Sequence, residues 1–280
     1  MYEPIRSARR YTIVRLVAAH FVLTLVVNLV FFAGNTFRPL ASATGGLLTG
    51  SLLVNLVFIG VLVGVIMIGF GRLRLYDLGI ILRNVRVGLA YTLGIWGAAQ
   101  AIHLIAGLVT YGSISLNRDW SNPGFMLGMV LAQILGNALF EEIAYRGFLF
   151  PQLYLRLAGL RDKPWRRLLT ALIVSQGLFA LSHIPNRIYL GMSPGDIALN
   201  VLLLLVLGVL YTLIYVRTDN LFIVVGIHAL GNTPTTLFQT APSLQGDGAS
   251  ILIYTLVIAA LLGAPLLRAY RERARLRLAV

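Results

Sequence analysis

The sequence predicts an all-α fold: a polytopic membrane helix bundle of about eight transmembrane helices, with both termini in the cytoplasm. Of the 280 residues, 58% are hydrophobic and only 12% are charged, and the mean hydropathy is +0.83, which is far from the profile of a soluble globular protein. Apolar runs recur at roughly the 20-residue length that a spanning helix needs. Residues 1–280 are therefore predicted to form one integral membrane domain, with the motif-bearing core at about 124–233.

The predicted spans follow from the positions of these apolar runs. They are 16–33, 47–70, 87–110, 124–150, 168–183, 197–215, one that begins at 221, and 251–267. The seventh run has only about thirteen residues before Pro234, which is too short to span unless it continues past a kink.

Basic residues give the predicted orientation. They precede the first run and follow the second, fourth and eighth runs, while the alternate connections carry few. Short cytoplasmic loops retain Arg and Lys, so the net charge of +13 indicates topology in the cell membrane, and no nucleic-acid partner is expected. Residues 1–10 are basic and lead into a run without a cleavage site, which predicts an uncleaved first span. The link at 72–86 suits either an amphipathic interfacial helix or a plain basic loop.

Two glutamates are the centre of the functional prediction. The chain has ten acidic residues, and only Glu141 and Glu142 lie within an apolar run. A carboxylate at bilayer depth costs about 2.5 to 3.5 kcal/mol, so the pair is a functional-site hypothesis. The structural alternative is an ion pair, and Glu142 with Arg146 at i,i+4 satisfies it. Glu141 points roughly 100° away, onto a stripe that runs back through Asn137 and Gln133.

The same run carries a face of small residues. Gly124, Gly128, Ala132 and Gly136 repeat at intervals of four. Small residues at this spacing let a neighbouring backbone come close in a membrane. The helix is therefore predicted to be central, with its carboxylates facing the bundle interior.

Other polar residues lie inside the first and third runs. His20, Thr24 and Asn28 share one face of the first, and Gln100 and His103 lie in the third. Polar residues within membranes most often make hydrogen bonds between helices, and this role is predicted for all five.

Two further motifs add histidines to the candidate site residues. Ser175, Phe179 and His183 lie one above another on a single helix face, and His228 and Asn232 form an i,i+4 pair in the seventh run. A single histidine at the end of a membrane helix is more often interfacial than catalytic. An imidazole and an amide together on one face are less readily explained by helix packing.

Together these residues have the chemistry for amide hydrolysis. Glu141 can act as a general base on water, and His183 can help to hold that water or protonate a leaving amine. His228 and Asn232 can donate hydrogen bonds to an oxyanion. The chain has no cysteine, no aspartate in an apolar run and no H-E-x-x-H motif. Ser182 is adjacent to His183 and so points away from it on a helix.

Three motifs carry a resemblance to a known family. They are Glu141-Glu142-x-x-x-Arg146, Phe179-x-x-x-His183 and His228-x-x-x-Asn232. In this order and at membrane depth they resemble the CPBP family of intramembrane proteases, which includes the CAAX prenyl endopeptidases and bacterial bacteriocin-processing or immunity proteins. The resemblance covers about 133–232, including the stretch 208–218.

The resemblance implies a role for each motif residue. The implied roles are water activation for Glu141 and His183, an oxyanion hole for His228 and Asn232, and support of the base for Glu142 and Arg146. The family is often labelled metalloprotease, and a Glu, His, His set could ligate zinc. The two-glutamate motif also supports a metal-free scheme, so the sequence requires no cofactor and leaves a zinc ion open.

The leading hypothesis is an intramembrane endopeptidase whose site opens toward the cytoplasm, because Glu141 lies near the end of the fourth run that faces the arginine-rich loop. Its substrates would be prenylated CAAX C-termini or membrane-associated peptides, and its surroundings the lipid bilayer. The alternatives are a non-catalytic membrane scaffold or bacteriocin-immunity-type protein, and a proton-coupled transporter. A transporter would use the glutamates and histidines as a relay, but the chain lacks the internal repeats that such folds often show.

Overall fold

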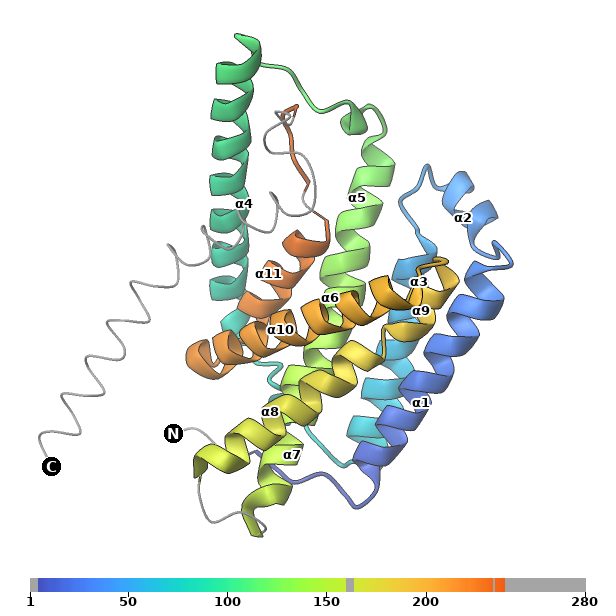
Figure 1. The fold of residues 1–280 in the computed structure, drawn as a ribbon, viewed down its shortest axis with the longest axis vertical. Coiled ribbons are helices and arrows are strands. Elements are labelled where there is room, and N and C mark those ends of the chain that lie inside the picture. Colours follow the sequence, from blue (N-terminus) through green and yellow to red (C-terminus); the bar gives the residue numbers. More distant parts are fainter. Residues whose placement is uncertain (1–4, 160–163, 234, 240–280) are drawn as a thin grey trace, which may run out of the picture.

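The computed structural model describes residues 5–159, 164–233 and 235–239. This part of the chain is helical, apart from short connections and an isolated bridge between Leu116 and Phe238 (Figure 1). It contains six helices that are long and apolar enough to cross a membrane, and one shorter apolar helix. The predicted helical membrane bundle is therefore confirmed, while the eighth predicted span, 251–267, lies outside the described residues.

The helices of the first half begin and end close to the predicted runs. The first crossing helix consists of α1 (Thr12–Val26) and a π-helical continuation, Val27–Phe32; α2 is Arg38–Ala43; α3 (Gly50–Phe58) continues as the π-helix Ile59–Phe70; and α4 is Leu82–Tyr111.

In the second half, one long helix carries the glutamates. It joins α5 (Pro123–Leu131), α6 (Ala138–Glu141) and α7 (Phe150–Arg156) through the π-helical segments Ala132–Asn137 and Glu142–Leu149. The helices that follow are α8 (Pro164–Leu181), α9 (Ile184–Tyr189), α10 (Pro194–Thr218) and α11 (Leu221–Asn232).

The link between the second and third crossing helices is a short turn rather than an amphipathic helix. A single 3-10 turn, Leu75–Leu78, is capped by Arg74 and Asp77. Gly79 then adopts a left-handed conformation with φ of 74°, which glycine allows and which ends the turn. Asp77 also accepts a hydrogen bond from the backbone N–H of Arg6 at 3.1 Å, so the turn holds the N-terminal segment.

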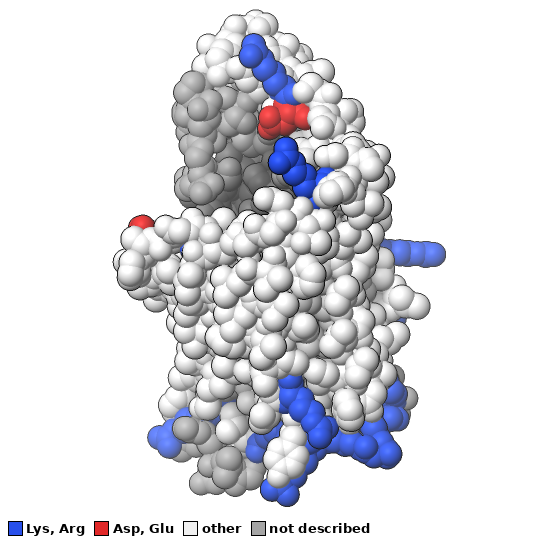
Figure 2. All heavy atoms as spheres, turned by 90° about the vertical axis from the view of Figure 1, so that its right-hand side faces the viewer, with Lys and Arg blue, Asp and Glu red and all other residues white. Residues whose placement is uncertain are grey.

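Three basic segments meet at one end of the molecule, which we call the arginine-rich end. Figure 2 shows arginine side chains gathered there, below a band that carries almost no charge on the face shown. The side chain of Gln152 in α7 bonds to the backbone of both Ala8, at 2.7 Å, and Arg6, at 2.8 Å. The backbone N–H of Arg9 bonds to the carbonyl of Gly71 at 3.3 Å. The residues before α1, after the second crossing helix and in α7 therefore lie together at this end.

The small-residue face of the long helix is confirmed. A Cβ atom added to Gly124 would lie 2.6 Å from the carbonyl oxygen of Gly45, and one added to Gly128 would overlap the carbonyl of Gly46. A Cβ atom added to Gly136 would lie 3.3 Å from the Cβ atom of Asn55 in α3. The turn before α3 and α3 itself therefore approach this face at backbone distance.

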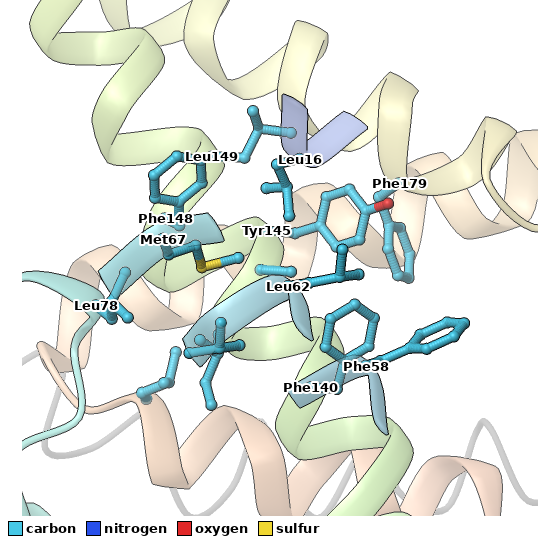
Figure 3. Close-up of a cluster of buried hydrophobic side chains, with 14 of the residues drawn as sticks. Leu16, Phe58, Leu62, Met67, Leu78, Phe140, Tyr145, Phe148, Leu149 and Phe179 are labelled. Atoms are coloured by element: carbon cyan, nitrogen blue, oxygen red, sulfur yellow. The ribbon is translucent and has the colours of Figure 1, made fainter. Parts of the chain in front are cut away.

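Aromatic side chains form the core next to the glutamates (Figure 3). Phe140 meets Phe58 edge to face with ring centroids 5.3 Å apart, and Tyr145 meets Phe179 in the same way at 5.1 Å. Such pairs add about 0.5 to 1.5 kcal/mol beyond the area they bury. They fix the long helix against α3 on one side and α8 on the other, and this sets the direction of the intervening carboxylates.

The short helix α11 runs parallel to α4 and ends inside the bundle. Gly88 contacts Phe222 at the start of the pair, and Gly226 contacts Thr92 one turn later, so both glycines permit close packing. The helix ends at Asn232 after 12 residues and does not continue as a helix in the described residues. The prediction that the seventh run is too short to span is confirmed.

The segment 235–239 is extended and is held by side chains of α4. Gln100 donates to the carbonyl of Thr235 at 3.1 Å and accepts from the backbone N–H of Leu237 at 2.7 Å. Trp96 donates to the same Thr235 carbonyl at 3.1 Å. Gln100 was predicted to bond another helix, and instead it satisfies the backbone of a non-helical segment, which has no partners of its own in lipid.

Candidate active site

The two glutamates lie where α6 passes into a π-helical segment. Both are buried, and Glu142 has no exposed surface. Arg146 donates through Nη1 to Glu142 Oε1 at 2.9 Å, and neither side chain reaches solvent. The predicted i,i+4 ion pair is confirmed, and Glu141 takes no part in it.

Arg146 is held on both sides by aromatic rings. Its guanidinium carbon lies 4.5 Å from the centre of the Phe179 ring and 5.6 Å from that of Tyr211. Its Nη2 atom donates to the carbonyl of Gly208 in α10 at 3.4 Å. Glycine is needed there, because a Cβ at position 208 would lie 3.3 Å from Nη2 and 2.8 Å from Oε1 of Gln176.

His228 connects the two glutamates. Its Nδ1 atom lies 2.7 Å from Glu142 Oε1, the oxygen that also accepts from Arg146. A carboxylate paired with arginine accepts hydrogen bonds, so the proton of this contact lies on Nδ1. The other ring nitrogen, Nε2, lies 3.4 Å from Glu141 Oε2.

His183 faces Glu141 from the opposite side. Its Nδ1 atom lies 2.9 Å from the carbonyl oxygen of Phe179, which can only accept, so Nδ1 carries the proton. In the neutral ring, Nε2 then presents a lone pair, and it lies 3.6 Å from Glu141 Oε1. This distance is too long for a hydrogen bond and is of the kind that a water molecule bridges.

Asn232 completes the predicted set, at the last turn of α11. It lies one helical turn beyond His228, and its Nδ2 atom donates to Gln133 Oε1 at 3.0 Å. The amide nitrogen has two hydrogens, so one remains for another acceptor. All six predicted site residues are therefore brought to one place by α6, the π-helical segment after it, the turn between α8 and α9, and α11.

A polar cavity of about 390 Å³ lies in front of these groups. Glu141, His183, His228 and Asn232 are among its lining residues, while Glu142 and Arg146 lie behind it. The predicted stripe of Gln133, Asn137 and Glu141 forms one wall.

The direction of the cavity differs from the predicted cytoplasmic opening. Its lining runs along the first crossing helix from His20 to Phe32 and includes Ser51 at the start of α3. Both Phe32 and Ser51 lie away from the arginine-rich end, since α1 begins at that end and the second crossing helix returns to it. The cavity therefore extends from Glu141 toward the opposite, arginine-poor end. The sequence indicates the position of Glu141 along its own helix. The direction of the cavity depends on how the side chains of several helices pack, which the position of one residue does not reveal.

The site does not fit the zinc ligand set that the sequence left open. Within residues 5–159, 164–233 and 235–239, no three His, Asp or Glu side chains are arranged to hold a metal ion. The two Nε2 atoms face different oxygens of Glu141, and the Nδ1 atoms are bonded to Glu142 and to a backbone carbonyl.

Comparison with known families bears on this geometry. Residues 123–234 match the family model Rce1-like, described as type II CAAX prenyl endopeptidase Rce1-like. The match confirms the resemblance to the CPBP family. It spans α5 to α11 and contains all six predicted site residues. No curated protein and no solved structure matches the chain.

The Rce1-like segment does not enclose the cavity alone. His20 in α1, outside that segment, lines the cavity, and its Nδ1 atom lies 2.8 Å from the hydroxyl of Tyr145. Asn28 accepts a hydrogen bond from Asn186 at 2.9 Å, so the predicted interhelical bonding is confirmed for both residues. Thr24 instead bonds to the carbonyl of His20 in its own helix. The sequence analysis did not predict that this polar face of the first crossing helix lines the site. The interval of four between His20, Thr24 and Asn28 was the sequence feature that could have indicated it.

Proposed function

We propose that this protein is an intramembrane endopeptidase in the cell membrane that hydrolyses a peptide bond with water activated between Glu141 and His183. The supporting observation is the 3.6 Å separation of Glu141 Oε1 and His183 Nε2 beside the cavity. Its substrates are prenylated CAAX C-termini or other membrane-associated peptides. The Rce1-like match supports this class of substrate.

The fixed protonation of His183 explains why two acceptors face each other. Its Nδ1–H is committed to the Phe179 carbonyl, so Nε2 can accept one hydrogen of a water molecule while Glu141 accepts the other. Both acceptors increase the electron density on the water oxygen. Glu141 has an oxygen, Oε2, with no hydrogen-bond partner among the described residues, so its capacity as a base is not used up by structural bonds.

Hydrolysis then proceeds with a balanced proton transfer. The water oxygen bonds to the scissile carbonyl carbon and Glu141 takes a water proton, which leaves a negative charge on the former carbonyl oxygen. Asn232 donates its second amide hydrogen to that oxygen, and His228 donates from Nε2 when this atom is protonated. The carbon–nitrogen bond breaks, and Glu141 returns the proton to the leaving amine.

Glu142 and Arg146 act on this chemistry through His228. The carboxylate accepts from Nδ1–H, which fixes the ring orientation and directs Nε2 toward the cavity. A protonated His228 would place its positive charge against Glu142, whose own charge is shared with Arg146. The ion pair is therefore a support for the imidazole rather than a reacting group.

The test is cleavage by purified protein in liposomes, with a farnesylated CAAX peptide beside a mixed peptide library. Glu141→Ala and His183→Ala are expected to lose cleavage by about 10²-fold or more while retaining the wild-type melting temperature. Asp196→Ala removes an exposed carboxylate and is the matched control. A chelator is expected to leave the rate unchanged.

Each result bears on a different part of the proposal. An active Glu141→Ala protein would overturn the assignment of the base. Loss of activity with the chelator, restored by zinc, would overturn the metal-free scheme. No cleavage of any peptide by folded wild-type protein would favour the non-catalytic scaffold.

A further inference from the structure

A single cation lies on the cavity wall. Among the described lining residues, Arg187 is the one lysine or arginine and Glu141 is the one acid. Arg187 belongs to α9 and lies one helical turn after His183, with its backbone N–H bonded to the His183 carbonyl at 3.1 Å. It is thus on the arginine-poor side of His183, in the direction in which the cavity extends.

Neutral amides orient this guanidinium. Its Nε atom donates to Asn200 Oδ1 at 2.7 Å, and its Nη1 atom donates to Asn186 Oδ1 at 2.8 Å. Asn186 is fixed in turn by its bond to Asn28 in the first crossing helix. Three helices therefore hold Arg187 in place, yet no carboxylate lies within 4.0 Å of it among the described residues.

The charges of the site leave Arg187 without a close counter-ion. Glu142 and Arg146 neutralise each other at 2.9 Å. Glu141 and Arg187 interact electrostatically but form no ion pair within 4.0 Å, and under the proposed function Glu141 is needed to bind water. Arg187 is half-buried on the cavity wall, so its charge faces a space that a ligand can enter. Its planar group is suited to a carboxylate, and its Nη2 atom makes no hydrogen bond with the described residues.

We propose that Arg187 binds the free C-terminal carboxylate of the peptide substrate, and so selects a scissile bond close to the chain end. This inference rests on the proposed endopeptidase function and names the substrate group that the same cavity recognises. Arg187 lies one helical turn, about 5.4 Å, beyond His183, and its side chain adds to this reach. A few residues of extended peptide, at about 3.3 Å each, cover the distance from the water site to the guanidinium. The peptide would lie with its terminus toward Arg187 and its reacting carbonyl at Glu141.

A different role for Arg187 would be to balance the charge of Glu141. That role would change the base itself, and its loss would alter the rate for every peptide equally. Recognition of a carboxylate would instead alter only substrates that possess one. Two peptides that differ only in a free or amidated C-terminus therefore separate the two roles.

The experiment measures kcat and KM for this pair of farnesylated peptides with wild-type protein and with Arg187→Gln. Wild type is expected to prefer the free acid by about 10-fold to 100-fold in kcat/KM, the range of a charge-assisted pair. Arg187→Gln is expected to lose this preference through a raised KM for the acid, with kinetics on the amide unchanged.

Two further variants guard against a folding defect. Asn200→Asp keeps Arg187 but places a carboxylate against its Nε atom, and it is expected to lose the same preference. Arg38→Gln removes an exposed arginine next to a neighbouring cavity, and it is expected to keep the preference. The melting temperature of each variant is compared with that of wild type.

The outcomes are distinct for the two levels of proposal. Cleavage of both peptides by wild type without preference, or an equal loss on both peptides in Arg187→Gln, would overturn carboxylate recognition alone. Absence of cleavage of either peptide by folded wild type would overturn the endopeptidase function and this inference with it.

Discussion

The Nδ1 atom of His228 and the Nη1 atom of Arg146 lie 2.7 Å and 2.9 Å from one oxygen of Glu142. A single buried carboxylate oxygen therefore joins α11 to the long helix and sets the orientation of an imidazole beside Glu141. Hydrogen bonds of this kind, with a charged acceptor, contribute about 1.5 to 3 kcal/mol each. The relationship assigns the second glutamate of the motif to positioning.

Glu142→Gln tests this assignment. The amide cannot neutralise Arg146 and holds the imidazole less firmly, so kcat is expected to fall by about 10-fold to 100-fold, as for other groups that orient a histidine. KM is expected to change little. Steady-state kinetics on the farnesylated peptide measure both values, with Asp196→Asn on the exposed surface as control. An unchanged kcat in folded Glu142→Gln would contradict the positioning role.

Removal of Arg146 is expected to affect stability as well as activity. Arg146→Met leaves the fully buried Glu142 without its cation, and loss of one partner of a buried pair costs about 3 to 5 kcal/mol. The double variant with Glu142→Leu is expected to recover much of that loss without recovering activity. Unfolding in detergent, read as a double-mutant cycle, measures the coupling. Additive effects would show that the two residues do not interact.

Asn232 is expected to act on the transition state. Asn232→Ala removes an amide donor beside the cavity and should lower kcat by about 10²-fold to 10³-fold with little change in KM. Gln133→Leu removes only the acceptor that orients Asn232, which is bonded at 3.0 Å, and a smaller loss is expected. Equal effects of the two variants would indicate that Asn232 serves the structure rather than the oxyanion.

Close packing of α10 against Arg146 is testable at Gly208. In Gly208→Ala the added Cβ would lie 2.8 Å from Gln176 Oε1 and 3.3 Å from Arg146 Nη2, so both side chains have to move. A loss of about 1 to 3 kcal/mol in stability is expected, together with lower activity. Gly177→Ala in α8 is the matched control, because nothing lies within 4 Å of its added Cβ. A neutral Gly208→Ala would show that Arg146 is not fixed by this contact.

Helical periodicity predicted the parts of the site that lie on one helix. Spacings of four placed Glu142 with Arg146 and His228 with Asn232, and the structure contains the first pair as an ion pair. The same spacing predicted the glycine face that α3 approaches. Helix lengths and arginine positions gave the order of the crossing helices, because both are properties of a segment by itself.

Features that depend on contacts between distant segments were not predicted. In the sequence, Arg187 is one of the few basic residues in the connections on the arginine-poor side. Its place on the cavity wall follows from its bonds to Asn186 and Asn200. His20 was assigned to helix packing, because nothing in α1 shows that Tyr145 and the cavity are its neighbours. The cavity direction and the short turn at Leu75–Leu78 likewise arise from packing between helices, on which a single-helix pattern carries no information.

The early end of α11 has a consequence for the solvent. Twelve residues extend about 18 Å, and the hydrocarbon core of a bilayer is about 30 Å thick. A helix of this length is shorter than the core that a spanning helix crosses. Its last turn carries Asn232, which lines the polar cavity. Under the proposed function, the space left where the helix stops is a route by which water reaches the peptide bond.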